Sequence, residues 1–236
     1  MNVLRSGLPL AALLALTLPT SAPAAAQSPD HPVGRISGSH MHTLLQKTVL
    51  RVNVLTVDLC FDDPTARRFT TIAARGRLTG ASADSITHAA LAGRLAVARV
   101  EFLRDIPLRD FLDGVGEDLR NAVAAGLVAD STYSAVTGGL PRWFAPLRQR
   151  GVRKGDVLVY EMQAEAVRMI YVSRDGQTLF DRTEPGRRRR NSPLAAWLAP
   201  GSPFRAGLLQ SLQHDGARSG RGAAAPVRAA SCGVTA

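Results

Sequence analysis

Residues 100–119 read VEFLRDIPLRDFLDGVGEDL, and this stretch is the part of the chain that decides the fold. A strand ends at about Asp105, and an amphipathic helix starts directly after Ile106-Pro107. Along that helix, apolar residues recur at spacings of three and four, which places them on one face. These apolar residues are Leu108, Phe111, Leu112, Val115, Leu119 and Val123. The stretch therefore predicts a strand that leads into a helix with one apolar face.

The segments on both sides predict the remaining elements. The predicted strands span residues 48–61, 95–103, 157–162, 167–173 and 177–181. The predicted helices span residues 65–75, 83–92, 108–125, 131–137, 140–150, 192–199 and 204–213. Ser82 is the expected N-cap of the second helix, and Gly138-Gly139 is expected to end the fourth. Strands joined by hairpins favour an antiparallel sheet, so we predict an α+β fold, an open-faced antiparallel sheet or sandwich covered by helices.

The first 26 residues have the features of a secretory signal. Arg5 supplies a positive charge, residues 8–18 form an apolar run, and Ala24-Ala25-Ala26 offers a cleavage site. The apolar run is too short to span a bilayer, which takes roughly 20 residues. We therefore expect an exported protein, periplasmic or secreted. A flexible leader at 27–43, one domain at 44–213 and a disordered tail at 214–236 would follow the signal.

The formal net charge is +10, and much of the excess lies in one run and in the tail. The run consists of Arg187, Arg188, Arg189 and Arg190. A basic run can bind nucleic acid or anionic lipid. Export and the absence of aromatic residues between the arginines argue against nucleic acid. This leaves a solvated loop, or weak contact between the run and an anionic membrane surface.

Other residue types give weaker indications. Cys60 and Cys232 are the two cysteines, and the sequence leaves open whether they pair. His40 and His42 have the spacing of a metal-ligand pair, but no acidic or cysteine cluster accompanies them. Neither a nucleophile elbow nor a phosphate-binding glycine loop is present. We therefore predict no metal site and no cofactor.

Five segments, in this order, resemble the pattern of the bacterial chalcone isomerase-like family. They are VNVLTVDLCF at 52–61, VEFLRDIPLRDFLDGV at 100–115, LRQRGVRKGDVLVYEM at 147–162, SRDGQTLFD at 173–181 and LAAWLAPGSPFRAGLLQSL at 194–212. The most specific part is the last segment, in which a tryptophan-containing helix and a Gly-Ser-Pro linker precede the final helix. The resemblance covers roughly residues 44–213.

The resemblance implies a large antiparallel sheet with helices on one side, which together enclose an apolar cleft. Plant members of the family close a flavanone ring by intramolecular addition of a phenol to an enone, and other members bind fatty acids. Both uses need a cation, because a phenolate or a carboxylate is costly in an apolar cleft unless it is paired. The candidate cations here are Lys47, Arg51 and Arg104.

Active members of the family also place a tyrosine near the start of the helix after the second strand. Residues 106–110 of this chain, IPLRD, contain no tyrosine, so we assign no catalytic residue. The first hypothesis is therefore an exported protein that binds a small apolar anionic ligand resembling a fatty acid. The alternatives are an intramolecular lyase, which is a type of isomerase, and a membrane-peripheral structural protein that uses the basic run.

Overall fold

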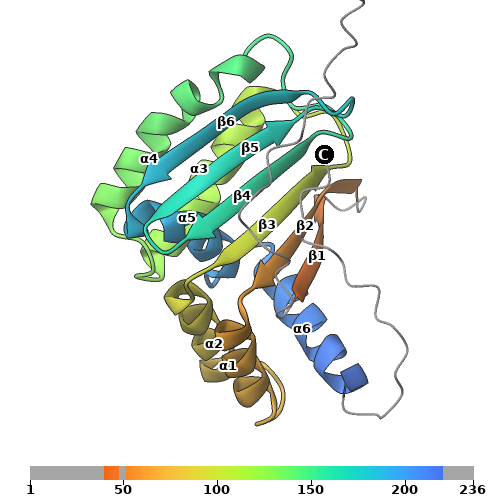
Figure 1. Ribbon diagram of the computed structural model, residues 1–236, viewed down its shortest axis with the longest axis vertical. Helices are drawn as coiled ribbons and strands as arrows, with labels where there is room; N and C mark the ends of the chain where they lie inside the picture. Colours follow the sequence, from red (N-terminus) through yellow and green to blue (C-terminus); the bar gives the residue numbers. More distant parts are fainter. Residues whose placement is uncertain (1–39, 48–51, 220–236) are drawn as a thin grey trace, which may run out of the picture. The chain divides into compact units, whose positions relative to one another are not determined.

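The computed structural model describes residues 40–47 and 52–219. Six strands form one sheet in the order in which they occur in the chain, and every neighbouring pair is antiparallel (Figure 1). The strands are β1 (His40–Lys47), β2 (Val52–Phe61), β3 (Ala96–Phe102), β4 (Val157–Gln163), β5 (Ala166–Val172) and β6 (Thr178–Pro185). The predicted α+β class with an open antiparallel sheet is confirmed.

Helices lie between β2 and β3, between β3 and β4, and after β6. They are α1 (Asp63–Ala73), α2 (Ala81–Ala92), α3 (Leu108–Ala124), α4 (Asp130–Trp143), η1 (Ala145–Leu147), α5 (Arg187–Leu198) and α6 (Arg205–Ser219). Helices α3, α4 and α5 lie behind the sheet in Figure 1 and cover one of its faces, whereas α6 packs against β1. None of the helices in the described ranges is both long and apolar enough to cross a membrane.

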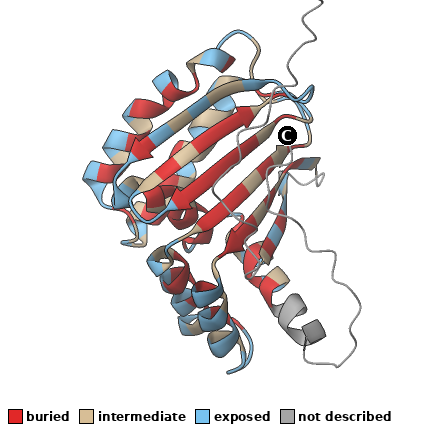
Figure 2. Ribbon diagram, in the orientation of Figure 1, coloured by how far each residue is buried: buried red, intermediate tan, exposed pale blue. Residues whose placement is uncertain are grey.

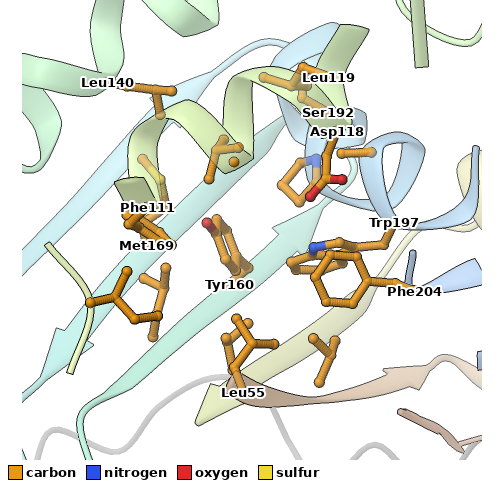
Figure 3. A pocket seen from close by; sticks show the side chains of 18 of the residues that line it. Leu55, Phe111, Asp118, Leu119, Leu140, Tyr160, Met169, Ser192, Trp197 and Phe204 are labelled. Carbon is orange, nitrogen blue, oxygen red and sulfur yellow. The ribbon is translucent and has the colours of Figure 1, made fainter. Parts of the chain in front are cut away.

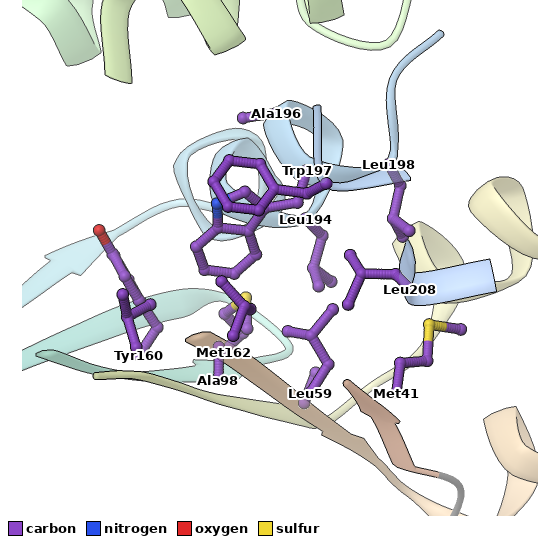
Figure 4. Close-up of a cluster of buried hydrophobic side chains, with 14 of the residues drawn as sticks. Met41, Leu59, Ala98, Tyr160, Met162, Leu194, Ala196, Trp197, Leu198 and Leu208 are labelled. Atoms are coloured by element: carbon purple, nitrogen blue, oxygen red, sulfur yellow. The ribbon is translucent and has the colours of Figure 1, made fainter. Parts of the chain in front are cut away.

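The main core lies between the sheet and these helices. Side chains alternate between the two faces of a strand, so the strand pairing places Leu59, Ala98 and Tyr160 on the same face. Figure 4 shows this face packing against residues of α5 and α6, and Figure 2 shows buried residues running along the central strands. The described members of this core form one continuous apolar layer that holds α5 and α6 on the sheet.

Close approach of α6 to the edge strand β1 depends on a glycine. A Cβ atom at Gly207 would lie 2.0 Å from Thr43 Oγ1, a separation at which the two atoms would overlap. Nearby, the backbone N–H of His42 donates to Ser211 Oγ at 2.8 Å. The contact holds β1 against α6, and β1 begins at His40, within the range expected to be a leader. At the other end α6 continues to Ser219, past the expected domain boundary at 213.

Two further boundary predictions are wrong. Gly138-Gly139 does not end a helix, because α4 runs through both residues to Trp143. The reason is packing: a Cβ atom at Gly139 would lie 2.5 Å from the Trp143 ring, so glycine makes room for the buried indole. Ser82 is not the N-cap of α2, since Gly80 holds that position. The Ser82 hydroxyl instead donates to Thr79 O at 2.9 Å within the preceding turn.

The arginine run is not a solvated loop but the first turn of α5. Arg187 and Arg188 are exposed, whereas Arg190 is 1% exposed. The Arg190 guanidinium donates to Gln163 O at 3.1 Å and to Leu91 O at 3.3 Å. It therefore joins α5 to the end of β4 and to the C-terminal turn of α2. Arg189 forms a salt bridge with Glu184 at 2.7 Å.

A buried carboxylate fixes the end of the sheet at which β4 begins. Asp156 accepts two hydrogen bonds from the Arg150 guanidinium (2.8 and 3.0 Å) and one from the Tyr171 hydroxyl (2.8 Å). The backbone N–H groups of Arg153 and Arg174 also donate to it, at 2.9 and 3.1 Å. Burial alone would raise the pKa of Asp156, but these donors outweigh burial and lower it. The carboxylate is therefore charged and fully paired.

The signal segment, most of the expected leader and the end of the expected tail lie outside the described residues. Cys60 is buried on β2 and is disulfide-bonded. The other cysteine of the sequence is Cys232, and it lies outside the described residues.

Candidate functional site

A cavity of about 350 Å³ lies between the sheet and helices α3, α4 and α5 (Figure 3). Its walls are largely apolar, and they come from all six strands and from helices α3, α4 and α5. The apolar lining includes Leu55, Val57, Val100, Leu158, Val167, Met169, Phe111, Val115, Leu119, Val136, Leu140, Ala196 and Trp197. A volume of this size lies in the range typical of small-molecule sites. The cavity is therefore the best candidate for a binding site in the described part of the chain.

One wall of the cavity is the predicted apolar face of α3. Phe111, Val115 and Leu119 lie on it as the spacing predicts, and Gly114 and Asp118 extend the same face. A Cβ atom at Gly114 would have no neighbour within 4 Å, so the glycine leaves open space in the middle of the wall. Asp118 is an acidic side chain on an otherwise apolar helix face, as Figure 3 shows.

The mouth of the cavity lies at the loop between β3 and α3. Its charged lining residues are Arg104, Asp105 and Asp110, all of which are exposed. The Asp105 carboxylate already has protein partners, because it accepts hydrogen bonds from Arg153 Nη1 at 2.9 Å and from the Lys154 backbone N–H at 2.8 Å. Arg104 forms no salt bridge with any described residue. Its guanidinium is therefore available for an anionic group at the mouth.

Two further charged residues line the cavity where β6 meets α5. Glu184 is buried and forms salt bridges with Arg182 at 2.6 Å and with Arg189 at 2.7 Å. Arg189 and Glu184 both belong to the cavity lining. Glu184 is shared by both arginines, so one positive charge is in excess at this end, but each guanidinium already has a carboxylate partner, which Arg104 does not.

Several polar groups of the lining have no hydrogen-bond partner among the described residues. Inside the cavity they include the carboxyl group of Asp118, the hydroxyl group of Tyr160 and Nε1 of Trp143. At the mouth, the side chains of Arg104 and Asp110 have no such partner either. Burial, helped by the negative charge of Glu117, raises the pKa of Asp118 to about 7. Burial also raises the pKa of the Tyr160 phenol, so that group stays neutral. The apolar cavity therefore contains unused hydrogen-bonding capacity.

The three cations predicted from the sequence fall in different places. Arg104 lines the cavity mouth. Lys47 is the last residue of β1, where it pairs with Val52, and its side chain lies outside the description. Arg51 lies outside the described residues.

The histidine pair lies on β1, away from the cavity lining. His40 Nε2 and His42 Nδ1 both hydrogen bond to Asp58 Oδ1, at 3.0 and 2.8 Å. Within the described ranges, no group of three or more His, Cys, Asp or Glu residues is arranged to hold a metal ion.

Sequence reasoning assigned no site role to Asp118, Tyr160, Trp143 or Trp197. A signal for Asp118 was present, because it follows Phe111 by seven residues and so falls on the apolar face of the helix. Tyr160 carried no such signal, since its role depends on which residues lie opposite it. Tyr171, by contrast, is structural: its hydroxyl donates to Asp156 and its ring stacks on Phe102.

Comparison of the sequence with protein-family models and with curated proteins finds no match. Among solved structures, the chain is similar to the crystal structure of the Arabidopsis thaliana fatty-acid binding protein AtFAP1. The two share 10% sequence identity, the alignment covers 77% of this chain and 90% of that chain, and the TM-score is 0.41. The α+β class given above rests on the strand pairing and helix packing of this chain.

Proposed function

We propose that the protein binds a single-chain amphiphile of the fatty-acid class, with the chain in the cavity and the anionic head at Arg104. The observation that carries this proposal is the 350 Å³ apolar cavity with a cation at its mouth that has no salt bridge to a described residue. Each buried methylene of a ligand contributes about 0.8 kcal/mol, so the apolar walls would supply most of the affinity.

The length of the cavity wall suits an extended chain. From Asp110 to Leu119, the first and last residues of α3 that line the cavity, the helix rises by about 14 Å, at 1.5 Å per residue. A compact or branched ligand would leave part of such a wall uncovered. A linear chain would run along α3 and keep its carboxylate in the solvent-accessible mouth, where the desolvation cost of the charge is small.

Tryptophan fluorescence provides a direct test, because the chain has two tryptophans and both line the cavity. Titration of ligand-free protein with dodecanoate should give saturable quenching or a spectral shift. Arg104→Gln should weaken dodecanoate about fivefold, a modest effect because the pair is exposed, and should leave dodecanol unaffected. Arg109→Gln is the matched control, since Arg109 is exposed and does not line the cavity. Absence of saturable binding would overturn the proposal.

Lys47 and Arg51 belong to the same proposal as additional head-group cations. If the head group needs more than Arg104, alanine at all three sites should weaken dodecanoate further than the Arg104 change alone. Unchanged affinity in the triple variant would rule out the proposed placement of the head group at these three cations, and the chain would then have another orientation.

A second candidate is an intramolecular lyase, and the observation that favours it is Asp118. A carboxyl group whose pKa is about 7, in an apolar cavity, is suited to act as a general base near neutral pH. It would take the proton of a phenol, whose oxygen then adds to an enone in the same molecule, and would return that proton to the α-carbon of the resulting enolate. Chalcone cyclisation no faster than in buffer between pH 6 and 9, or an equal rate in Asp118→Asn, would exclude this role.

Export and membrane contact are separate proposals. A disulfide at Cys60 supports an oxidising compartment such as the periplasm or the exterior. Membrane contact would rest on Arg187 and Arg188, because Arg190 is buried and Arg189 is paired with Glu184. Salt-sensitive binding to anionic vesicles that is lost in the Arg187→Ser/Arg188→Ser variant would support it.

A further inference from the structure

We infer that the inner part of the cavity is a second, polar subsite, which recognises a hydroxyl group near the far end of the ligand chain. The preferred ligand would then be an ω-hydroxylated acyl chain rather than a plain one. This inference rests on the proposed function, since it adds a second recognition point to the same cavity.

The subsite is formed by Tyr160 on β4 and Asp118 on α3. Figure 3 shows the two side chains entering the cavity from opposite walls, with the Trp197 indole nitrogen directed toward the same space. Tyr160 is only 8% exposed and Asp118 is half-buried, yet neither the hydroxyl nor the carboxyl has a hydrogen-bond partner among the described residues. Buried polar groups are nearly always hydrogen-bonded, so the unpaired Tyr160 hydroxyl, with the Asp118 carboxyl facing the same apolar cavity, indicates a polar group of the ligand.

Both residues lie at a similar depth from the cavity mouth. Asp118 lies about 15 Å along α3 from Leu108, the first residue of the helix. Tyr160 pairs with Ala98, four residues before the end of β3 at Phe102, which corresponds to about 13 Å along the strand. The mouth residue Arg104 lies two residues beyond that end of β3. A chain whose carboxylate is at Arg104 would therefore reach the two polar groups only with its distal atoms.

The chemistry of the two groups favours a hydroxyl over other oxygen functions. The Tyr160 hydroxyl is neutral and can donate to the ligand oxygen, and the Asp118 carboxylate can accept the ligand O–H. A second carboxylate on the ligand would instead lie beside Asp118 and be repelled. A plain methyl terminus would bury both groups and give neither of them a partner, which is the costly arrangement.

The test compares three probes on the full chain by tryptophan fluorescence and calorimetry. They are dodecanoate, ω-hydroxydodecanoate and β-hydroxydodecanoate, whose hydroxyl lies next to the carboxylate. We expect the ω-hydroxy probe to bind about tenfold more tightly than dodecanoate, and the β-hydroxy probe to show no gain. Tyr160→Phe and Asp118→Leu should each reduce this preference by about threefold or more. Tyr133→Phe is the control, because its hydroxyl accepts from Arg120 and lies outside the cavity lining.

The outcomes separate the two proposals. Dodecanoate and ω-hydroxydodecanoate binding with equal affinity would overturn the polar subsite and leave the proposed function intact. A preference that persists in both Tyr160→Phe and Asp118→Leu would also overturn it. Failure of all three probes to bind would refute the proposed function itself. Because the comparison of probes uses the wild-type protein, the test does not depend on how well the variants fold.

Discussion

Replacing Gly114 should block the cavity without harming the fold. This glycine lies in the middle of the cavity wall formed by α3, and a Cβ atom there would meet nothing within 4 Å. A side chain at this position would therefore project into the space that the ligand is proposed to fill. We expect Gly114→Ala and Gly114→Leu to weaken binding in a graded manner.

The size of the effect follows from the ligand methylenes that the new side chain displaces. Alanine would displace about one methylene, at about 0.8 kcal/mol, which lowers affinity about fourfold. Leucine would displace about three, which costs about 2.4 kcal/mol and lowers affinity about fiftyfold. Both changes should raise the free energy of unfolding by about 0.8 kcal/mol, because glycine is unfavourable in a helix interior.

Dodecanoate titration and urea unfolding would measure the two effects, with Gly138→Leu as the matched control. Gly138 is an exposed glycine inside α4, its Cβ atom would also meet nothing within 4 Å, and it does not line the cavity. The control should gain similar stability and keep full affinity. If Gly114→Leu is folded and binds dodecanoate as tightly as the wild type, the ligand does not occupy this cavity.

Three further predictions concern stability. Asp156→Ala leaves the buried Tyr171 hydroxyl and the half-buried Arg150 guanidinium without their acceptor, and should cost about 3–5 kcal/mol in urea unfolding; a cost below about 1 kcal/mol would contradict the assigned network. Lowering the pH through the depressed pKa of Asp156 should remove its contribution in the same way. Asp118 has the opposite sign: its pKa rises to about 7 on folding, so its contribution to stability falls between about pH 4 and pH 7. The shift corresponds to about 4 kcal/mol at full burial. Asp118 is half-buried, so Asp118→Asn should be about 2 kcal/mol more stable than the wild type at pH 8. Equal stability of the two proteins at pH 8 would exclude the shift. Gly139→Ala should lower stability by about 1–3 kcal/mol, because the new methyl group meets the Trp143 ring; an unchanged melting temperature would show that the ring can move.

The fold class could be predicted because local patterns along the chain agree with one another. The apolar spacing on α3 and the Asp175-Gly176 hairpin between β5 and β6 each specify a local structure that is kept in the fold. Predictions failed where packing between distant segments decided the outcome. Gly138-Gly139 is a break by local preference, yet the buried Trp143 keeps the helix intact across it.

The site was less predictable than the fold. Arg104 could be proposed because a charged residue at the end of a strand is visible in the sequence. Tyr160 and Gly114 could not, because their roles depend on which side chains face them across the cavity. The arginine run shows the same limit. Four consecutive cations suggested a solvated loop, but Arg190 is buried and donates hydrogen bonds to carbonyl groups of β4 and α2.

The most direct test of the central claim is native mass spectrometry of the protein purified without added ligand, alongside Gly114→Leu. The proposed function predicts that the wild type carries one adduct with the mass of a fatty acid or a hydroxylated fatty acid, and that Gly114→Leu largely loses it. A wild-type protein that carries no adduct and takes up no added dodecanoate would contradict the claim. An adduct retained equally by both proteins would show that the ligand binds elsewhere.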